Sequence, residues 1–198
     1  MRRGVVVKVG GSLLEWEELP ERLDAYLKSR RKELIFLIAG GGRAVDLIRD
    51  LDHRHGLGDE RAHALALYAL DLSAHILASL VSGLEVVESP DLIAKICAEG
   101  RIPVLATRRF VNADDGSAFE PLPHNWSVTS DSIAARMATL IGAKELVLLK
   151  SAPLPEGADR VEAARLGLVD AVFPAVSRRL ELVTYLNLRE PGAIARLL

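Results

Sequence analysis

Four short stretches of this 198-residue chain carry residue types that bind anions. In the first, Lys8-Val-Gly-Gly-Ser12, a lysine interrupts a run of valines and two glycines follow it. A lysine is almost never buried unless a charge pairs with it, and glycines let backbone N–H groups approach a ligand closely. The other three are Gly40-Gly-Gly42, Thr129-Ser-Asp131-Ser132 and Lys150. Together these stretches predict a site for a phosphate group.

The two lysines and the aspartate favour phosphoryl transfer as the chemistry of this site. That reaction requires positioning and positive charge around the moving group, with little covalent help from the protein. Lys8 and Lys150 would lie on either side of the transferred group, and Asp131, at the start of a helix, would orient both lysines. Backbone N–H groups would hold phosphate oxygens on both reactants; we expect these to come from Gly10, Gly11, Gly41 and Gly42.

The elements that must position these residues alternate between buried strands and helices. Two strands each end in a glycine-rich turn that leads into a helix, which indicates parallel strands. The carboxyl ends of parallel strands share one edge of the sheet, where such folds bind ligands. The predicted strands are 3–9, 33–39, 84–87, 102–106, 145–149 and 180–185. The fold class is therefore α/β, a three-layer α/β/α sandwich with a mainly parallel open sheet of about six to eight strands.

The rest of the chain is predicted to be helical or irregular. Helices are expected over 13–30, 43–51, 60–81, 90–99, 127–141 and 160–166, with a short helix at the carboxyl terminus. The polar segment 52–58 and the segment 107–128, which has neither helical nor strand periodicity, are expected to be loops. The longer loop contains His124, Asn125 and Trp126, which would shape an acceptor pocket or simply pack.

Composition limits the classes of function. Hydrophobic residues make up 49% and charged residues 26% of the chain, as in a soluble globular domain. The net charge of -2 gives no bulk attraction for nucleic acid or anionic membrane. The single cysteine, Cys97, excludes an internal disulfide and a multi-cysteine metal cluster. No secretory signal or membrane-spanning run is evident, so we expect a cytoplasmic protein.

In their order along the chain, these motifs resemble those of the amino acid kinase family. Lys8-Val-Gly-Gly-Ser12 is similar to the opening of the family, whose lysine stabilises the phosphoryl group in transit. Gly40-Gly-Gly42 is similar to the turn that contacts the acceptor, and Thr129 to Ala135 to the segment whose aspartate organises the catalytic lysines. The resemblance implies a single amino acid kinase-like domain over 1–198, with an acceptor-binding half of about 1–128 and a nucleotide-binding half of about 129–198.

The resemblance also implies an ATP-dependent kinase, with Mg²⁺ carried by the ATP phosphates. Lys8, Asp131 and Lys150 would be catalytic. The nucleotide would contact Gly10, Gly11, Ser12, Lys150 and Ser151, and the acceptor would contact Gly40, Gly41, Gly42, Arg43, Asn125 and Ser130. The helix over 60–81 would form the seam of a homodimer, since a helix in this region commonly does so in the family.

Within the family, Asn125 to Ala134 and Leu148 to Ser151 look most like the aminomethylfuranmethanol phosphate kinases of methanofuran-type coenzyme synthesis. Those enzymes transfer the γ-phosphate of ATP to an existing phosphomonoester. The chain departs from the family after Lys150, where Ser151 to Gly157 replaces an Asp-Val-Asp-Gly-type loop, so the nucleotide half is abbreviated.

Four alternatives stay open at this point. The chain could be a non-catalytic anion- or nucleotide-binding relative of the same fold, or a kinase for another small acid or phosphate. Asp131 could be only a helix cap, and Arg43 an ordinary surface arginine. His53 and His55 have no role that the sequence assigns.

Overall fold

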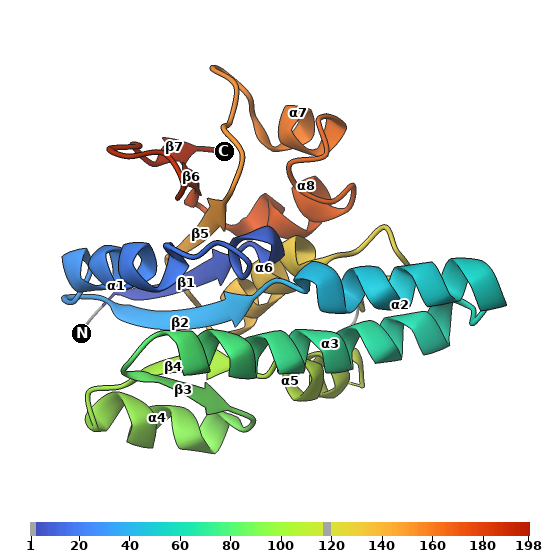
Figure 1. The fold of residues 1–198 in the computed structure, drawn as a ribbon, viewed down its shortest axis with the longest axis horizontal. Coiled ribbons are helices and arrows are strands. Elements are labelled where there is room, and N and C mark those ends of the chain that lie inside the picture. The colour runs from blue at the N-terminus through green and yellow to red at the C-terminus, as the bar shows by residue number, and fades with distance from the viewer. Residues whose placement is uncertain (1–2, 117–119) are drawn as a thin grey trace.

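The computed structural model describes residues 3–116 and 120–198. Within them, seven strands form one open sheet in the order β3-β4-β2-β1-β5-β6-β7 (Figure 1). Neighbouring strands are parallel except for β6 and β7, which are antiparallel. The predicted α/β class and mainly parallel sheet are therefore confirmed. The strands are β1 Gly4–Val9, β2 Leu34–Ala39, β3 Leu84–Val87, β4 Ile102–Leu105, β5 Glu145–Lys150, β6 Val183–Asn187 and β7 Arg196–Leu197.

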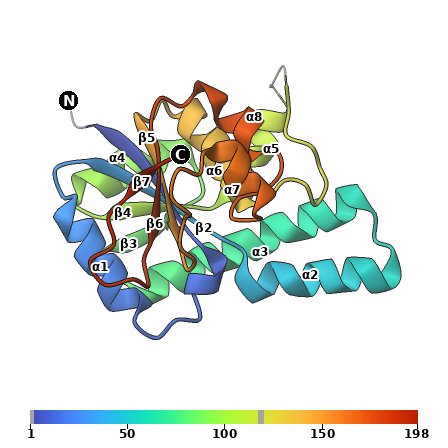
Figure 2. The same cartoon turned by 90° about the horizontal axis from the view of Figure 1, so that it is seen from above.

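Helices cover both faces of the sheet (Figure 2). On one face, apolar residues of α1 and of the second half of α3 pack against β1 and β2. On the other face, α5, α6 and α8 pack against β1, β2 and β5. The helices are α1 Leu19–Ser29, α2 Gly42–His55, α3 Asp59–Leu80, α4 Pro90–Ala98, α5 Thr107–Asp115, α6 Ser130–Leu140, α7 Arg160–Arg165 and α8 Phe173–Val176, with 3-10 turns η1 Gly11–Leu13 and η2 Ser177–Arg179.

The alternation of side chains along β1 and β5 decides where the two lysines point. The odd-numbered valines of β1 lie in the core on the α1 face, and Val6 lies in the core on the α6 face. Lys8 is two residues after Val6 and therefore faces α6. Lys8 pairs in register with Leu148 of β5, whose side chain lies in the same α6-facing core. Lys150 follows Leu148 by two residues, so both lysines meet α6 at the carboxyl edge of the sheet.

A helical hairpin formed by α2 and α3 extends beyond this edge of the sheet (Figure 1). Within the described residues, α3 alone is long and apolar enough, by composition, to cross a membrane. Its Leu67, Leu70 and Leu77 are buried among residues of the sheet and of the helices that cover it. We conclude that α3 is a partly buried core helix.

The prediction of a loop over 107–128 is wrong in its first part, where α5 forms. Only three residues of α5 are buried, and they include polar Thr107 and Asp114, so hydrophobic periodicity gives no signal. Arg136 of α6 donates to Asp114 at 2.7 and 2.9 Å and ties the helix to the core. Residues 117–119 of the predicted loop lie outside the described residues, and 120–126 is irregular as expected. The helix predicted over 127–141 begins only at Ser130, because Thr129 is its N-cap.

Three other predicted elements differ from the structure. The first helix begins at Leu19, because residues 11–13 form a 3-10 turn and Pro20 occupies the first helical turn. The predicted loop over 52–58 is shorter, since α2 continues to His55 and closes on Gly56, whose φ of 62° is left-handed. The terminal helix is absent from the described residues; Arg196–Leu197 pairs with β6 as a strand.

Candidate active site

Lys8, Asp131 and Lys150 form one buried ion triad at the carboxyl edge of the sheet. The Nζ of Lys8 lies 2.7 Å from Oδ1 of Asp131, and the Nζ of Lys150 lies 2.6 Å from Oδ2. The three side chains are 4%, 6% and 14% exposed in chain order. Lys150 also donates to the carbonyl oxygen of Leu168 at 2.7 Å. The structure thus brings together the three residues that the sequence predicted to act as a unit.

The triad carries two positive charges against one negative charge. Burial alone would raise the pKa of Asp131, but the charges of Lys150 and Lys8 outweigh burial and hold that pKa at about 2. Burial, together with the charge of Lys8, lowers the pKa of Lys150 to about 8 against the opposing effect of Asp131. The unit is therefore a buried, net-positive site, which an anionic phosphoryl group would complement.

The sequence analysis missed Asp170, which holds the amino-terminal turn of α6 in place. Its carboxylate accepts hydrogen bonds from the backbone N–H and hydroxyl of Thr129 and from those of Ser132. It also accepts from the N–H groups of Val172 and Phe173. Asp170 therefore fixes the turn that presents Asp131 to the lysines. The available signal was a lone carboxylate inside the apolar segment Leu166–Phe173.

The two glycine turns lie backbone against backbone beside the triad. A Cβ on Gly11 would lie 2.1 Å from the backbone nitrogen of Gly42, and a Cβ on Gly40 would lie 2.5 Å from that of Gly11. The N–H groups of Gly10 and Gly40 donate to the carbonyl oxygens of Leu149 and Val9. The N–H of Gly10, which was predicted to hold phosphate, is thus already used in the fold. Gly41 and Gly42 instead lie at the amino terminus of α2, where N–H groups favour an anion.

Substituting Gly11 by alanine should therefore destabilise the protein, because the new methyl group must push the two turns apart. We expect the free energy of unfolding to fall by about 1–3 kcal/mol or more, the range for overpacking of a tight contact. Denaturant unfolding measures this change. Gly4→Ala is the matched control, since its Cβ would meet nothing closer than 3.9 Å; equal effects of the two substitutions would contradict the steric interpretation.

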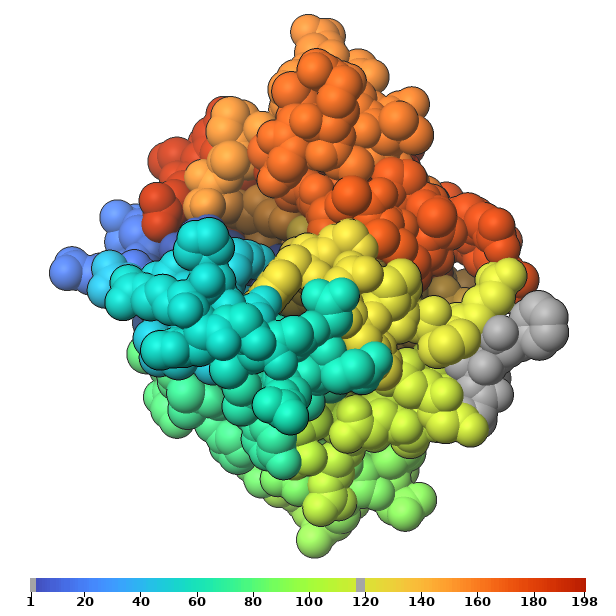
Figure 3. Space-filling view, turned by 90° about the vertical axis from the view of Figure 1, so that its right-hand side faces the viewer, coloured from blue at the N-terminus to red at the C-terminus, as the bar shows by residue number. Residues whose placement is uncertain are grey.

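A cavity of about 250 Å³ opens between the glycine turns, the α2–α3 hairpin and the amino-terminal turn of α6. Figure 3 shows the molecule from this side, where the segment before α6 lies alongside the α2–α3 hairpin. One end of the cavity is formed by Gly11, Ser12, Gly41, Gly42, Thr129 and Ser130, and its wall includes Leu67, Leu70, Val128 and Ile133. The other end is polar and includes Asp46, Arg49, His63 and Trp126. This cavity would accept a small molecule with an anionic end at the glycine turns.

Several predicted site residues lie elsewhere. Arg43 does not line this cavity; its side chain is 85% exposed and pairs with Glu15 at 2.6 Å. Asn125 also lies outside the lining, and its side-chain oxygen accepts from the N–H and hydroxyl of Ser127. Ser12 and Ser151, both predicted to contact nucleotide, share a hydrogen bond of 2.8 Å between their hydroxyl groups.

Two further residues, Arg49 and Trp126, line the cavity. Trp126 was expected either to shape an acceptor pocket or to pack, whereas no role was predicted for Arg49. The guanidinium of Arg49 lies 4.7 Å from the centre of the Trp126 ring. The indole Nε1 of Trp126 donates to Asp52 at 2.7 Å. These contacts join the segment before α6 to α2, and they leave Arg49 as the arginine that borders the cavity in place of Arg43.

Comparison with known proteins gives a consistent assignment. The sequence model of the amino acid kinase family matches residues 3–153. A (5-(aminomethyl)furan-3-yl)methyl phosphate kinase from Methanocaldococcus jannaschii is 24% identical over 144 residues, which are 72% of this chain and 63% of that protein. The match thus spans less than two thirds of the relative's length.

Solved structures with a similar fold include two enzymes named for uridylate. The UMP kinase of Ureaplasma parvum superposes with a TM-score of 0.65 at 14% identity, covering 98% of this chain and 93% of that chain. The uridylate kinase of Archaeoglobus fulgidus gives a TM-score of 0.59 at 19% identity, covering 93% and 89%. At these identities the likeness concerns the fold alone.

Proposed function

This chain belongs to the amino acid kinase family, and on that premise we propose that it transfers the γ-phosphoryl group of ATP to a small acceptor. The observation that carries the proposal is the buried triad of Lys8, Asp131 and Lys150 at the ends of two adjacent strands. A transferring phosphoryl group spreads negative charge over its outer oxygens, and fixed positive charges stabilise that state.

Each member of the triad has a separate task in this mechanism. Lys8 and Lys150 neutralise charge on the phosphoryl group as it moves between ATP and the acceptor. Asp131 does not contact phosphate; it holds both lysines in place before substrate arrives, so little reorganisation is required during the reaction. The N–H groups at the start of α2, from Gly41 and Gly42, hold the acceptor's anionic end.

We further propose that the acceptor is itself a phosphomonoester, such as aminomethylfuranmethanol phosphate. The activity for which the Methanocaldococcus jannaschii relative is named supports this substrate class. The cavity supports it as well, because a phosphate would lie at the glycine turns while a small ring packs on Leu67 and Leu70. The other product of the reaction would be ADP, and the acceptor would become a diphosphate.

ATP would approach from the side of Ser151, with Mg²⁺ bound mainly by phosphate oxygens and water. A second cavity, of about 260 Å³, lies next to the end of β5 and is lined by Pro153, Leu154, Tyr185 and Asn187 among others. This cavity belongs to the part of the chain that the sequence assigned to nucleotide. In this proposal, the second cavity is the surface of the abbreviated nucleotide-binding half on which the nucleotide lies.

We also propose that the chain forms a homodimer through α3. Five large apolar side chains lie at helical spacing on the outer face of this helix and are 39% to 59% exposed. They are Leu65, Tyr68, Leu72, Ile76 and Leu80. A contiguous apolar stripe of this kind is typical of an interaction surface. Light scattering should give the mass of two chains, and Leu72→Glu should give the mass of one.

Phosphorus NMR tests the proposed reaction. The chain is incubated with Mg-ATP and one phosphomonoester at a time, and a productive acceptor gives diphosphate signals as the γ-phosphate signal of ATP disappears. Isothermal titration calorimetry with Mg-ATP accompanies the screen. Absence of both turnover and nucleotide binding would instead support a non-catalytic, anion-binding relative of the same fold.

The pH dependence of the reaction follows from Lys150. Because its pKa in the free protein is about 8, kcat/KM should fall as the pH rises through about 8 and the amine loses its charge. Bound phosphate favours the charged amine, so the fall in kcat should occur at higher pH. Asp131, with a pKa of about 2, adds no decline on the acid side between pH 5 and pH 8.

Lys150→Arg is the control, since a guanidinium keeps its charge throughout this range. The variant should react more slowly but should lose the decline near pH 8. A decline that persists unchanged in Lys150→Arg would assign the titration to another group.

A further inference from the structure

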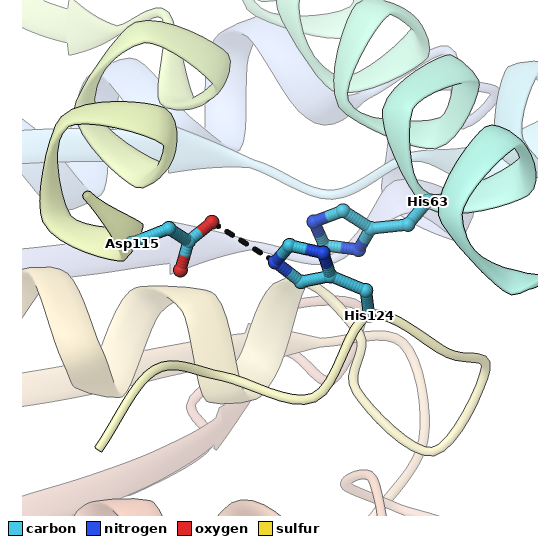
Figure 4. Close-up of side chains that lie close together, drawn as sticks. All are labelled: His63, Asp115 and His124. Atoms are coloured by element: carbon cyan, nitrogen blue, oxygen red, sulfur yellow. Dashed lines mark hydrogen bonds and ion pairs between the residues drawn. The ribbon is translucent and has the colours of Figure 1, made fainter.

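Three side chains from separate elements meet (Figure 4), and one of them, His63, lines the polar end of the cavity of about 250 Å³ described above. His63 comes from the first half of α3, Asp115 is the last residue of α5, and His124 lies in the irregular segment before α6. One ligand atom from each residue lies within 4.8 Å of the others. Figure 4 shows both imidazole rings directing a nitrogen toward the carboxylate of Asp115.

Two atoms of this cluster are buried without a hydrogen-bond partner among the described residues. They are Nε2 of His63 and Oδ1 of Asp115. Buried polar atoms in folded proteins nearly always have a partner, so an orphaned nitrogen and an orphaned carboxylate oxygen side by side require a common explanation. Both are atoms that bind metal ions through a free electron pair.

The third ligand is held in the orientation that metal binding requires. Nδ1 of His124 lies 2.8 Å from Oε2 of Glu60, and Nε2 of the same ring lies 3.1 Å from Oδ2 of Asp115. A histidine that binds a metal almost always donates its other N–H to a carboxylate or carbonyl. With Nδ1 donating to Glu60, Nε2 faces the carboxylate of Asp115 either as a second N–H or, in the neutral ring, with an electron pair that a cation between the two residues would bind.

We propose that His63, Asp115 and His124 bind one divalent transition-metal ion, with Zn²⁺ as the expected occupant and Glu60 as the carboxylate that orients His124. Two imidazoles and one carboxylate form a ligand set that suits Zn²⁺ and is unsuited to Mg²⁺, which prefers oxygen. The site is therefore distinct from the Mg²⁺ that ATP would bring. A fourth position is left for water.

The cluster has to contract slightly to bind the ion. At bond lengths of about 2.0–2.1 Å, tetrahedral ligand atoms lie roughly 3.4 Å apart. The ligand atoms lie within 4.8 Å of one another, so the widest separation must close by at most about 1.4 Å. The two rings lie nearly parallel, 4.2 Å apart with an angle of 6° between their planes, and must tilt toward one another. His124 lies in an irregular segment, where a change of this size costs less than in a helix.

The position of the site indicates what the ion would do. Its ligands join α3, α5 and the segment that leads into α6, and His63 borders the cavity. An ion bound there holds that segment, including Trp126, against the helical hairpin. Metal binding thus organises the polar end of the cavity. The proposal of a metal site does not depend on the proposal that the chain transfers a phosphoryl group, and the two can be tested separately.

Metal titration of tag-free protein tests the proposal. The chain is stripped with EDTA, and Co²⁺ is added without nucleotide while the visible absorption of the ion is followed; calorimetry with Zn²⁺ gives the affinity. Wild type should bind one equivalent. His63→Gln and His124→Gln should each weaken binding by at least about 100-fold, and Glu60→Gln by about 10–100-fold. His75→Gln is the matched control, an exposed histidine on the same helix, and should bind as wild type does.

Circular dichroism in EDTA establishes that each variant is folded, and Asp115→Asn provides a ligand substitution of nearly unchanged size. Absence of Zn²⁺ binding to wild type at millimolar concentration would overturn the proposal. Unchanged affinity in both His63→Gln and His124→Gln would overturn it as well, because the ion would then bind elsewhere.

Discussion

Replacing Lys8 with methionine is expected to lower kcat by about a thousandfold or more, while the protein remains folded. A single fixed positive charge on a transferring phosphoryl group contributes about 10³–10⁵ in rate, which corresponds to roughly 4–7 kcal/mol of transition-state stabilisation. Methionine keeps the length and apolar stem of lysine, and Asp131 keeps Lys150 as a partner in the variant. Initial rates with saturating ATP and acceptor measure the effect.

Lys28→Met is the matched control for this experiment. Its side chain is 75% exposed on α1 and pairs with Asp24 in the same helix. We expect this variant to turn over at the wild-type rate. A Lys8→Met protein that keeps more than about one tenth of the wild-type rate would show that Lys8 only fills the core, since the charge is expected to contribute far more.

Replacing Asp131 with asparagine should cost more stability than any other substitution in the triad. Removing one partner of a buried ion pair costs about 3–5 kcal/mol, because the charge that stays behind is uncompensated. Here two lysines, 4% and 14% exposed, lose their shared counter-charge. For a domain of this size the melting temperature should fall by about 6–20 °C, and phosphoryl transfer should fall to the level of Lys8→Met.

Thr129, and not Asp131, is the N-cap of α6, so the remaining alternative for Asp131 is an interaction with the helix dipole alone. The size of the loss in stability separates that alternative from the role in the triad. Asp131 lies in the first turn of α6, where a carboxylate acting only on the helix dipole contributes about 0.3–1 kcal/mol. A loss below about 1 kcal/mol would therefore favour an interaction with the helix dipole alone. The double variant Asp131→Asn with Lys150→Met provides a second check, since deleting one of the two uncompensated charges should restore part of the stability without restoring activity.

The sequence was sufficient to predict the centre of the fold and the triad. β1, β2 and β5 are runs of buried, mostly apolar residues, which Lys8 interrupts in β1 and which Glu145 and Lys150 bound in β5, so their existence follows from local composition. Their parallel order follows from the glycine turns and the helices between them. Once Lys8 and Lys150 are placed at neighbouring strand ends, and Asp131 at a helix start, their meeting is a consequence of that topology.

The parts that could not be predicted depend on contacts between distant segments. α5 has little apolar surface and is held through Asp114 and Arg136. β7 has two residues and exists only because β6 lies beside it. Asp170 accepts a hydrogen bond from Ser132 at the start of α6, although the two residues are 38 positions apart in the sequence. His63 stacks on His124 although α5 lies between them in the chain. No local pattern encodes such pairings.

A crystal structure with MgADP, aluminium fluoride and an acceptor found by phosphorus NMR tests the central claim most directly. Aluminium fluoride takes the place of the phosphoryl group in transit. We predict that its fluorine atoms lie about 3 Å, within hydrogen-bond distance, from Nζ of both Lys8 and Lys150, with Asp131 still paired to the lysines. A fluoride complex bound away from both lysines would contradict the assignment of this triad as the phosphoryl-transfer site.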